Sequence, residues 1–148
     1  MDNLLLFETT HFYAIQARDY RVPGYVIIYS KSECDSLAGF DAGQGAELMQ
    51  CLVLAERIVQ QLLTPERIYI LKFGEALPRI HFHVVPRTAR IGLAFEQQSS
   101  NQPPYNGARL VDWLWQQHAS LGYGDEELTD FIKQAREVAQ QSGLGNTG

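Results

Sequence analysis

The segment from Arg79 to Pro86 constrains the fold more than any other part of this sequence. Along it, apolar residues alternate with larger polar ones, which is the period of a β-strand whose two faces meet different surroundings. One face is apolar and consists of Ile80, Phe82 and Val84. The other face carries Arg79, His81, His83 and Val85. The segment therefore predicts a strand that buries one side and presents a cation and two imidazoles on the other.

A long amphipathic helix is expected over about residues 42–63. Apolar residues recur there at three- and four-residue spacing: Leu48, Leu52, Ala55, Val59 and Leu62. Asp41 and Gln44 have the spacing of a capping box at its start. Thr64 should end it, because a residue that precedes a proline avoids helical geometry.

The remaining elements set the fold class. Strands are expected over 11–17, 25–29 and 67–73, a polar loop over 96–106, and helices over 109–118 and from Asp125 onward. The sequence thus predicts an α+β fold: an antiparallel sheet of about five strands, the long helix packed on it, and extra C-terminal helices. We expect one domain over 1–148, with a core of about 5–90, a helical extension of about 106–141 and a flexible tail of 142–148.

Composition narrows the function classes. The formal charge of −5 argues against binding of a nucleic-acid polymer through a basic surface. No apolar run reaches the length of a membrane span. Only two cysteines occur, Cys34 and Cys51, so neither a disulfide framework nor a thiolate metal site is indicated. We expect a cytoplasmic protein without membrane contact.

Three interpretations of His81 and His83 compete. The two side chains could be polar residues on a solvated sheet face. They could be two zinc ligands, but a zinc site needs a third protein ligand, and Arg79 beside them would repel a cation. They could also serve nucleophilic catalysis, because a neutral imidazole can attack phosphorus and carry a covalent intermediate. Lys72, Arg79, Arg87 and Arg90 lie close in sequence, which favours a small anion as the ligand.

The segment from His81 to Arg87 resembles the motif of the histidine-triad (HIT) superfamily, in which histidines alternate with apolar residues before Pro-Arg. His81 matches the middle histidine, the nucleophile of that family, and His83 matches the third. The stretch from Pro23 to Lys31 is similar to the family's Pro-Gly-His strand. A long helix, a strand and a Gly turn follow in the family's order, so the resemblance covers roughly residues 5–90.

The resemblance implies a nucleotide-binding hydrolase or transferase. It would cleave a nucleotide anhydride, ester or phosphoramidate at the α-phosphate through a nucleotidyl-histidine, with His81 and His83 catalytic and no metal or other cofactor. Arg79 and Arg87 would bind phosphate. The expected ligand is a nucleotide or a dinucleoside-polyphosphate-like molecule. Candidate nucleoside contacts, each also suited to a plain core or turn position, are Phe7, Ile15, Asp19 and Ile28.

Two departures from the family pattern support an alternative function. Arg79 stands where the first histidine of the triad would be, and Tyr25 stands where many members have a further histidine. The alternative is a catalytically degenerate protein that binds nucleotides without turning them over; a His-x-His zinc protein is more remote. The resemblance also implies a homodimer. Trp113 and Trp115 cannot both face one core from a helix, so we expect one of them to meet a partner subunit or to cover the site.

Overall fold

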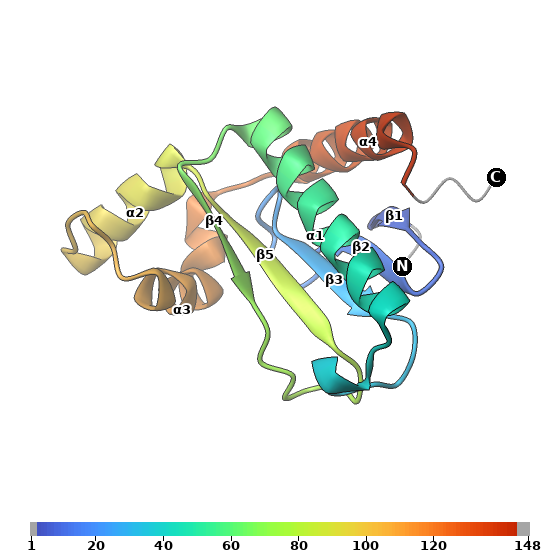
Figure 1. Cartoon of the computed structure of the whole chain (residues 1–148). Helices are drawn as coiled ribbons and strands as arrows, with labels where there is room; N and C mark the ends of the chain where they lie inside the picture. Colours follow the sequence, from blue (N-terminus) through green and yellow to red (C-terminus); the bar gives the residue numbers. More distant parts are fainter. Residues whose placement is uncertain (1–2, 145–148) are drawn as a thin grey trace.

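The computed structural model describes residues 3–144 and contains one five-stranded antiparallel sheet (Figure 1). Its strands lie in the order β1-β2-β3-β5-β4. Their bounds are β1 Leu5–Glu8, β2 Phe12–Gln16, β3 Val26–Ser30, β4 Arg67–Leu71 and β5 His81–Arg87. The expected α+β fold with its antiparallel sheet is confirmed. Four strands lie where the sequence predicts them, and β1 is the fifth, for which the sequence predicted no residue range.

The turn between β2 and β3 depends on a glycine. The two strands pair as an antiparallel hairpin from Phe12 opposite Ser30 to Gln16 opposite Val26. Gly24 adopts a φ of 87°, a conformation that residues with a Cβ rarely take. Its backbone N–H donates to the buried side chain of Gln16. The Pro-Gly turn therefore sets how β3 enters the middle of the sheet.

One face of the sheet is covered by α1 (Ala42–Leu63) and α4 (Asp125–Ser142), as Figure 1 shows. The expected limits of α1 are confirmed, and the capping box between Asp41 and Gln44 is present. Phe131, Ile132 and Ala135 of α4 join the same buried cluster as α1 and the apolar face of β5. The C-terminal helix is thus part of the main core.

The other face is partly covered by α2 (Ala89–Ser99), α3 (Gly107–Gln117) and the short 3-10 helix η2 (His118–Leu121). Their buried side chains meet the sheet around Ile15, Tyr25 and Val85. A second 3-10 helix, η1 (Leu37–Gly39), precedes α1. Two layers of helices therefore enclose the sheet, and the side of α2 and α3 faces the strand surface that carries the histidines.

Three expectations are corrected. Residues 96–99 belong to helix α2, because Thr88 caps its start and the apolar side chains of Ile91 and Phe95 are buried one turn apart. The strand expected from Arg79 begins at His81, so Arg79 lies before β5. The tail expected from 142 overlaps α4, which ends at Ser142, while residues 145–148 lie outside the described part of the chain.

Candidate active site

Strand β5 places His81 and His83 side by side on the same face of the sheet. Phe82 and Val84, between and after them, point the other way into the cluster under α1. The two imidazole centroids are 5.4 Å apart and the rings are tilted by 52°. His81 is buried, with 9% of its surface exposed, and His83 is half-buried. The strand alternation that the sequence predicts therefore does pair the two imidazoles.

Tyrosines of the neighbouring strands continue the histidine face. Tyr29 of β3 is directly opposite His81 in the sheet, and Tyr13 of β2 is opposite Tyr29. Tyr29 and His81 are stacked with ring centroids 5.5 Å apart, and Tyr13 and Tyr29 are stacked at 5.1 Å. The result is a row of three rings across three strands, which presents flat π-faces at the side of the imidazole pair.

A hydrogen-bonded chain reaches His83 from two other elements. The hydroxyl of Tyr25, just before β3, lies 2.6 Å from Nδ1 of His83. The indole Nε1–H of Trp115, on α3, donates to the same hydroxyl at 2.8 Å. Tyr25 itself is fully buried. Residues separated by up to 90 positions in the sequence are thus joined at one imidazole.

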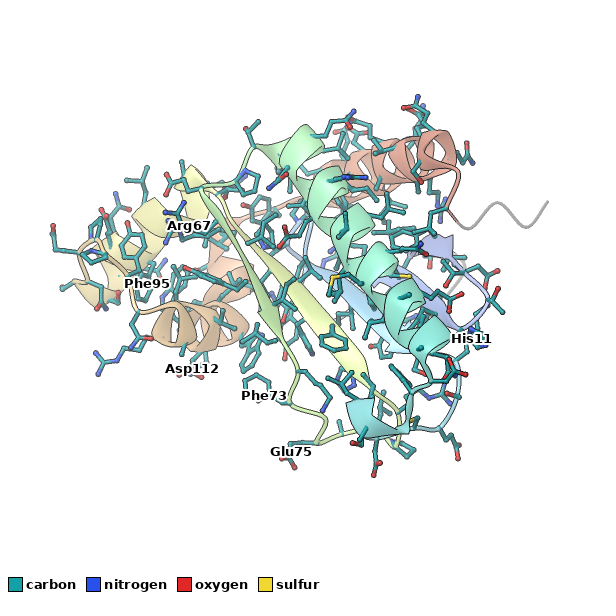
Figure 2. The ribbon with its side chains drawn as sticks, in the orientation of Figure 1. His11, Arg67, Phe73, Glu75, Phe95 and Asp112 are labelled. Carbon is teal, nitrogen blue, oxygen red and sulfur yellow. The ribbon has the colours of Figure 1, made fainter. Side chains whose placement is uncertain are left out.

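Two further aromatic residues enclose this chain. Tyr20 stacks on Tyr25 with centroids 5.0 Å apart and on Trp115 at 6.0 Å, and it meets His118 edge to face. Phe73, on the segment that follows β4, contacts Trp115 at 5.8 Å and is drawn in Figure 2 on the side where α3 lies. Trp113 and Trp115 were expected to face different surroundings, and Trp115 is the one whose ring lies against His83.

The surroundings of His81 favour one tautomer of its neutral imidazole. Its Nδ1 lies 3.3 Å from the backbone carbonyl oxygen of Arg79. A carbonyl oxygen can only accept, so this contact is a hydrogen bond only if Nδ1 carries the proton. The neutral imidazole then keeps its lone pair on Nε2, where a nucleophile needs it.

The two arginines expected at the phosphate are not equally placed. Arg79 lies two residues before His81, the first residue of β5; it is partly exposed, and its backbone carbonyl contacts His81. Arg87 lies at the other end of β5, where its guanidinium bonds the Tyr69 hydroxyl, pairs with Glu66 and lies over the Tyr105 ring. We therefore remove Arg87 from the phosphate site, because its charge is already paired in a separate hollow between β4 and α2.

The four nucleoside candidates are divided between the two faces of the sheet. Phe7 and Ile28 belong to the buried cluster under α1 and α4, so we withdraw them as nucleoside contacts. Ile15 lies on the histidine face, since it pairs with Ile27 and Ile27 pairs with His83. Asp19 is exposed in the loop after β2, and its charge acts on Tyr20 and Tyr29. Only Ile15 and Asp19 remain candidates.

Sequence reasoning missed several aromatic residues of the site: Tyr13, Tyr20, Tyr29 and Phe73. Tyr13, Tyr29 and Phe73 lie in expected strands and Tyr20 lies in a turn-like stretch, so nothing in the sequence marked them as site residues. Tyr25 was noted because it departs from the family pattern, but its bond to His83 has no signal in the sequence.

No group of three or more His, Cys, Asp or Glu side chains within residues 3–144 is arranged to hold a metal ion. In the same part of the chain, no helix has both the length and the apolar character needed to cross a membrane.

Because His83 is partly buried, the free energy of unfolding should depend on pH through this residue. Desolvation, with a smaller contribution from His81, lowers the pKa of His83 from 6.5 to about 4. Between these two values the unfolded chain binds the proton and the folded chain does not. The free energy of unfolding should therefore gain from His83 as the pH rises from about 4 to about 6.5, and lose that gain as the pH falls. Urea unfolding of wild type and His83→Gln at about pH 5 and about pH 7 tests this. An equal pH dependence in both proteins would contradict it.

Comparisons with known proteins support the fold. No family model matches the chain. The Drosophila melanogaster nitrilase and fragile histidine triad fusion protein NitFhit is 20% identical over 112 residues, which is 68% of this chain and 24% of that protein. The chain thus spans only a minor part of that relative's length.

Two solved structures have a similar fold. A hypothetical histidine triad nucleotide-binding protein from Sulfolobus tokodaii superposes with a TM-score of 0.62 and 15% identity, covering 97% of this chain and 89% of that one. The diadenosine triphosphate hydrolase of Plasmodium falciparum superposes with a TM-score of 0.53 and 11% identity, covering 92% and 80%. The chain therefore has the fold of the histidine-triad proteins.

Proposed function

We propose that the protein is a nucleotidyl hydrolase or transferase in which His81 is the nucleophile. The observation that carries this proposal is the pair of imidazoles on β5, with Nδ1 of His81 3.3 Å from a backbone carbonyl oxygen to which it can donate. That arrangement leaves Nε2 with a lone pair beside a second imidazole. Similarity to a nucleotide-binding protein and to a diadenosine triphosphate hydrolase supports a nucleotide as the substrate.

The proposed reaction has two steps. In the first, the lone pair of His81 Nε2 forms a bond to the α-phosphorus, and the bond from that phosphorus to the leaving group breaks with its electron pair. In the second, water attacks the same phosphorus, the P–N bond returns its electrons to His81, and nucleoside monophosphate leaves. His83 offsets the charge that grows on the phosphoryl oxygens, and the row of Tyr13, Tyr29 and His81 offers rings at the side of the site.

The decisive experiment is a substrate panel. The protein is incubated with diadenosine triphosphate, related dinucleoside polyphosphates and adenosine and guanosine phosphoramidates, and released monophosphate is measured. Release that is lost when His81 is changed to alanine supports the proposal. Absence of monophosphate with every member of the panel would contradict it.

A second candidate function is nucleotide binding without turnover. Two observations favour it: position 79 holds an arginine where the motif would have its first histidine, and His81 is largely buried. Trapping separates the two functions. A labelled nucleotide that binds but forms neither an acid-labile adduct on His81 nor free monophosphate would favour the binding protein.

The proposal includes a homodimer acting in the cytoplasm. Apolar side chains of α1 are exposed, Met49 by 59% and Val53 by 40%, and Ile70 is 42% exposed on the edge strand β4. Burying such side chains against a second copy would be favourable. Light scattering at micromolar concentration should give the mass of a dimer, and Met49→Glu should shift it toward a monomer. A monomer mass for wild type would contradict the dimer.

A further inference from the structure

His83 is held at Nδ1 by a chain of two hydrogen bonds that begins at helix α3. Trp115 donates its indole proton to the Tyr25 hydroxyl at 2.8 Å, and that hydroxyl lies 2.6 Å from His83 Nδ1. We propose that Tyr25 and Trp115 are positioning residues that hold His83 as the neutral tautomer with its proton on Nε2, so that it donates toward a phosphoryl oxygen. The purpose of this arrangement rests on the proposed function, but the tautomer can be measured without turnover.

The number of available protons supports this direction. An indole nitrogen only donates, so the oxygen of Tyr25 must accept from Trp115. The hydroxyl has one proton of its own and is fully buried. Within residues 3–144, the other partner that the hydroxyl contacts is His83 Nδ1. If Nδ1 were protonated, the hydroxyl proton would lack an acceptor in a buried place, which is unfavourable. Nδ1 is therefore the acceptor, and the proton of a neutral His83 is on Nε2.

The environment keeps both groups in the required protonation states. Burial raises the pKa of the Tyr25 hydroxyl, so it stays a donor. Burial and the neighbouring His81 lower the pKa of His83 to about 4, so its imidazole is neutral near neutral pH. Tyr20 stacks on both Tyr25 and Trp115, which restricts the two side chains to this geometry.

The two histidines then have opposite tautomers. A neutral His81 that donates from Nδ1 to the carbonyl of Arg79, 3.3 Å away, keeps a lone pair on Nε2. His83 accepts at Nδ1 and keeps a proton on Nε2. The pair thus offers one nucleophilic nitrogen and one hydrogen-bond donor, which is what attack on phosphorus with stabilisation of its oxygens requires. Tyr25 stands where the resembling family often has a histidine. With Trp115 bound to its oxygen, its hydroxyl donates to His83 Nδ1 and so keeps that nitrogen unprotonated.

The tautomer can be read by NMR. Long-range proton–nitrogen spectra of the full chain with ¹⁵N-labelled histidine distinguish the two neutral forms, and the spectrum of His83→Gln assigns the His83 signals. In wild type we expect His83 to be neutral with its proton on Nε2. A proton on Nδ1 in wild type would overturn the proposal without any further variant.

Variants test the two positioning residues. Tyr25→Phe removes the donor, and we expect a mixture of His83 tautomers. Trp115→Phe frees an acceptor position on the Tyr25 oxygen, so we expect a smaller shift toward the Nδ1-protonated form. Tyr123→Phe is the matched control, because its hydroxyl contacts Thr88 and its ring contacts Arg90, and its His83 signals should stay as in wild type. Wild-type signals in Tyr25→Phe would overturn the proposal, and wild-type signals in Trp115→Phe would overturn the part played by Trp115.

Kinetics give an independent readout on the best substrate of the panel. Changing a residue that positions a catalytic side chain should lower kcat by about 10- to 100-fold, with a much smaller effect on KM. We expect this for Tyr25→Phe. An unchanged kcat together with a changed tautomer would show that the tautomer does not serve catalysis and would overturn that part. If wild type released no monophosphate at all, the proposed function would fail, while the NMR result would still decide the tautomer.

Discussion

His81→Ala should abolish release of nucleoside monophosphate from any substrate that the wild-type protein cleaves. The proposed route passes through a covalent bond between His81 Nε2 and phosphorus, and alanine offers no atom that could form it. Nδ1 of His81 also lies beside a carbonyl oxygen, and a neutral imidazole that donates to it has its lone pair on Nε2. The measurement is monophosphate release by wild type and variant under the same conditions.

His83→Ala should retain part of the activity. Loss of one donor to the phosphoryl oxygens typically lowers the rate by about 100- to 1,000-fold, while the covalent route remains open. Nucleotide affinity should fall less than the rate in both variants, because in the proposed complex the base and sugar would be bound by other residues. Arg79→His, which would complete the histidine-triad motif that the sequence resembles, should leave activity unchanged or raise it. Turnover at the wild-type level by His81→Ala would show that β5 is not the catalytic strand.

Ile28→Ala should lower the free energy of unfolding strongly and leave nucleotide affinity unchanged. Ile28 is completely buried in the middle of the sheet, opposite Ala14 and Phe82, on the side that α1 covers. Removing a buried isoleucine side chain typically costs about 2–5 kcal/mol, because apolar contacts are lost and a cavity remains. Urea unfolding gives the stability, and titration with AMP gives the affinity of the folded variant.

Ile15→Ala is the matched comparison. Ile15 is also buried and lies in a paired strand, but on the histidine face. The loss of stability should be of the same order, about 2–5 kcal/mol. Affinity for AMP should fall in this variant and not in Ile28→Ala. A weaker affinity in Ile28→Ala alone would mean that the nucleoside approaches the sheet from the side of α1.

Much of the site's scaffold follows from local sequence. The alternation from Ile80 to Val84 is visible without any partner strand, because side chains of a strand point to opposite faces in turn. It therefore predicts that His81 and His83 share a face. The limits of α1 are also local, since the Asp41 capping box and Pro65 define its two ends.

Other features depended on the tertiary structure. In β3, Val26 to Ile28 are buried on both faces, so alternation cannot tell which of them faces the histidines. That decision comes from register, which places Ile27 opposite His83 and Ile28 opposite Phe82. The end of helix α2 was assigned to a loop because Glu96 to Ser99 are all polar, whereas the burial of Ile91 and Phe95 comes from contact with α3 and the sheet.

The sequence by itself determined the fold class, the long helix and the pairing of His81 with His83, because each of these follows from periodicity within one segment. Only the tertiary structure decided what surrounds that pair. Trp115 lies 90 positions from Tyr25, and Tyr25 lies 58 positions from His83. Hydrogen bonds of this kind depend on how α3 docks on the sheet, and no local pattern encodes which distant side chains such docking brings within 3 Å. For the same reason, Arg87 was assigned to phosphate by its place beside the motif, whereas its partners Glu66, Tyr69 and Tyr105 hold it at the other end of β5.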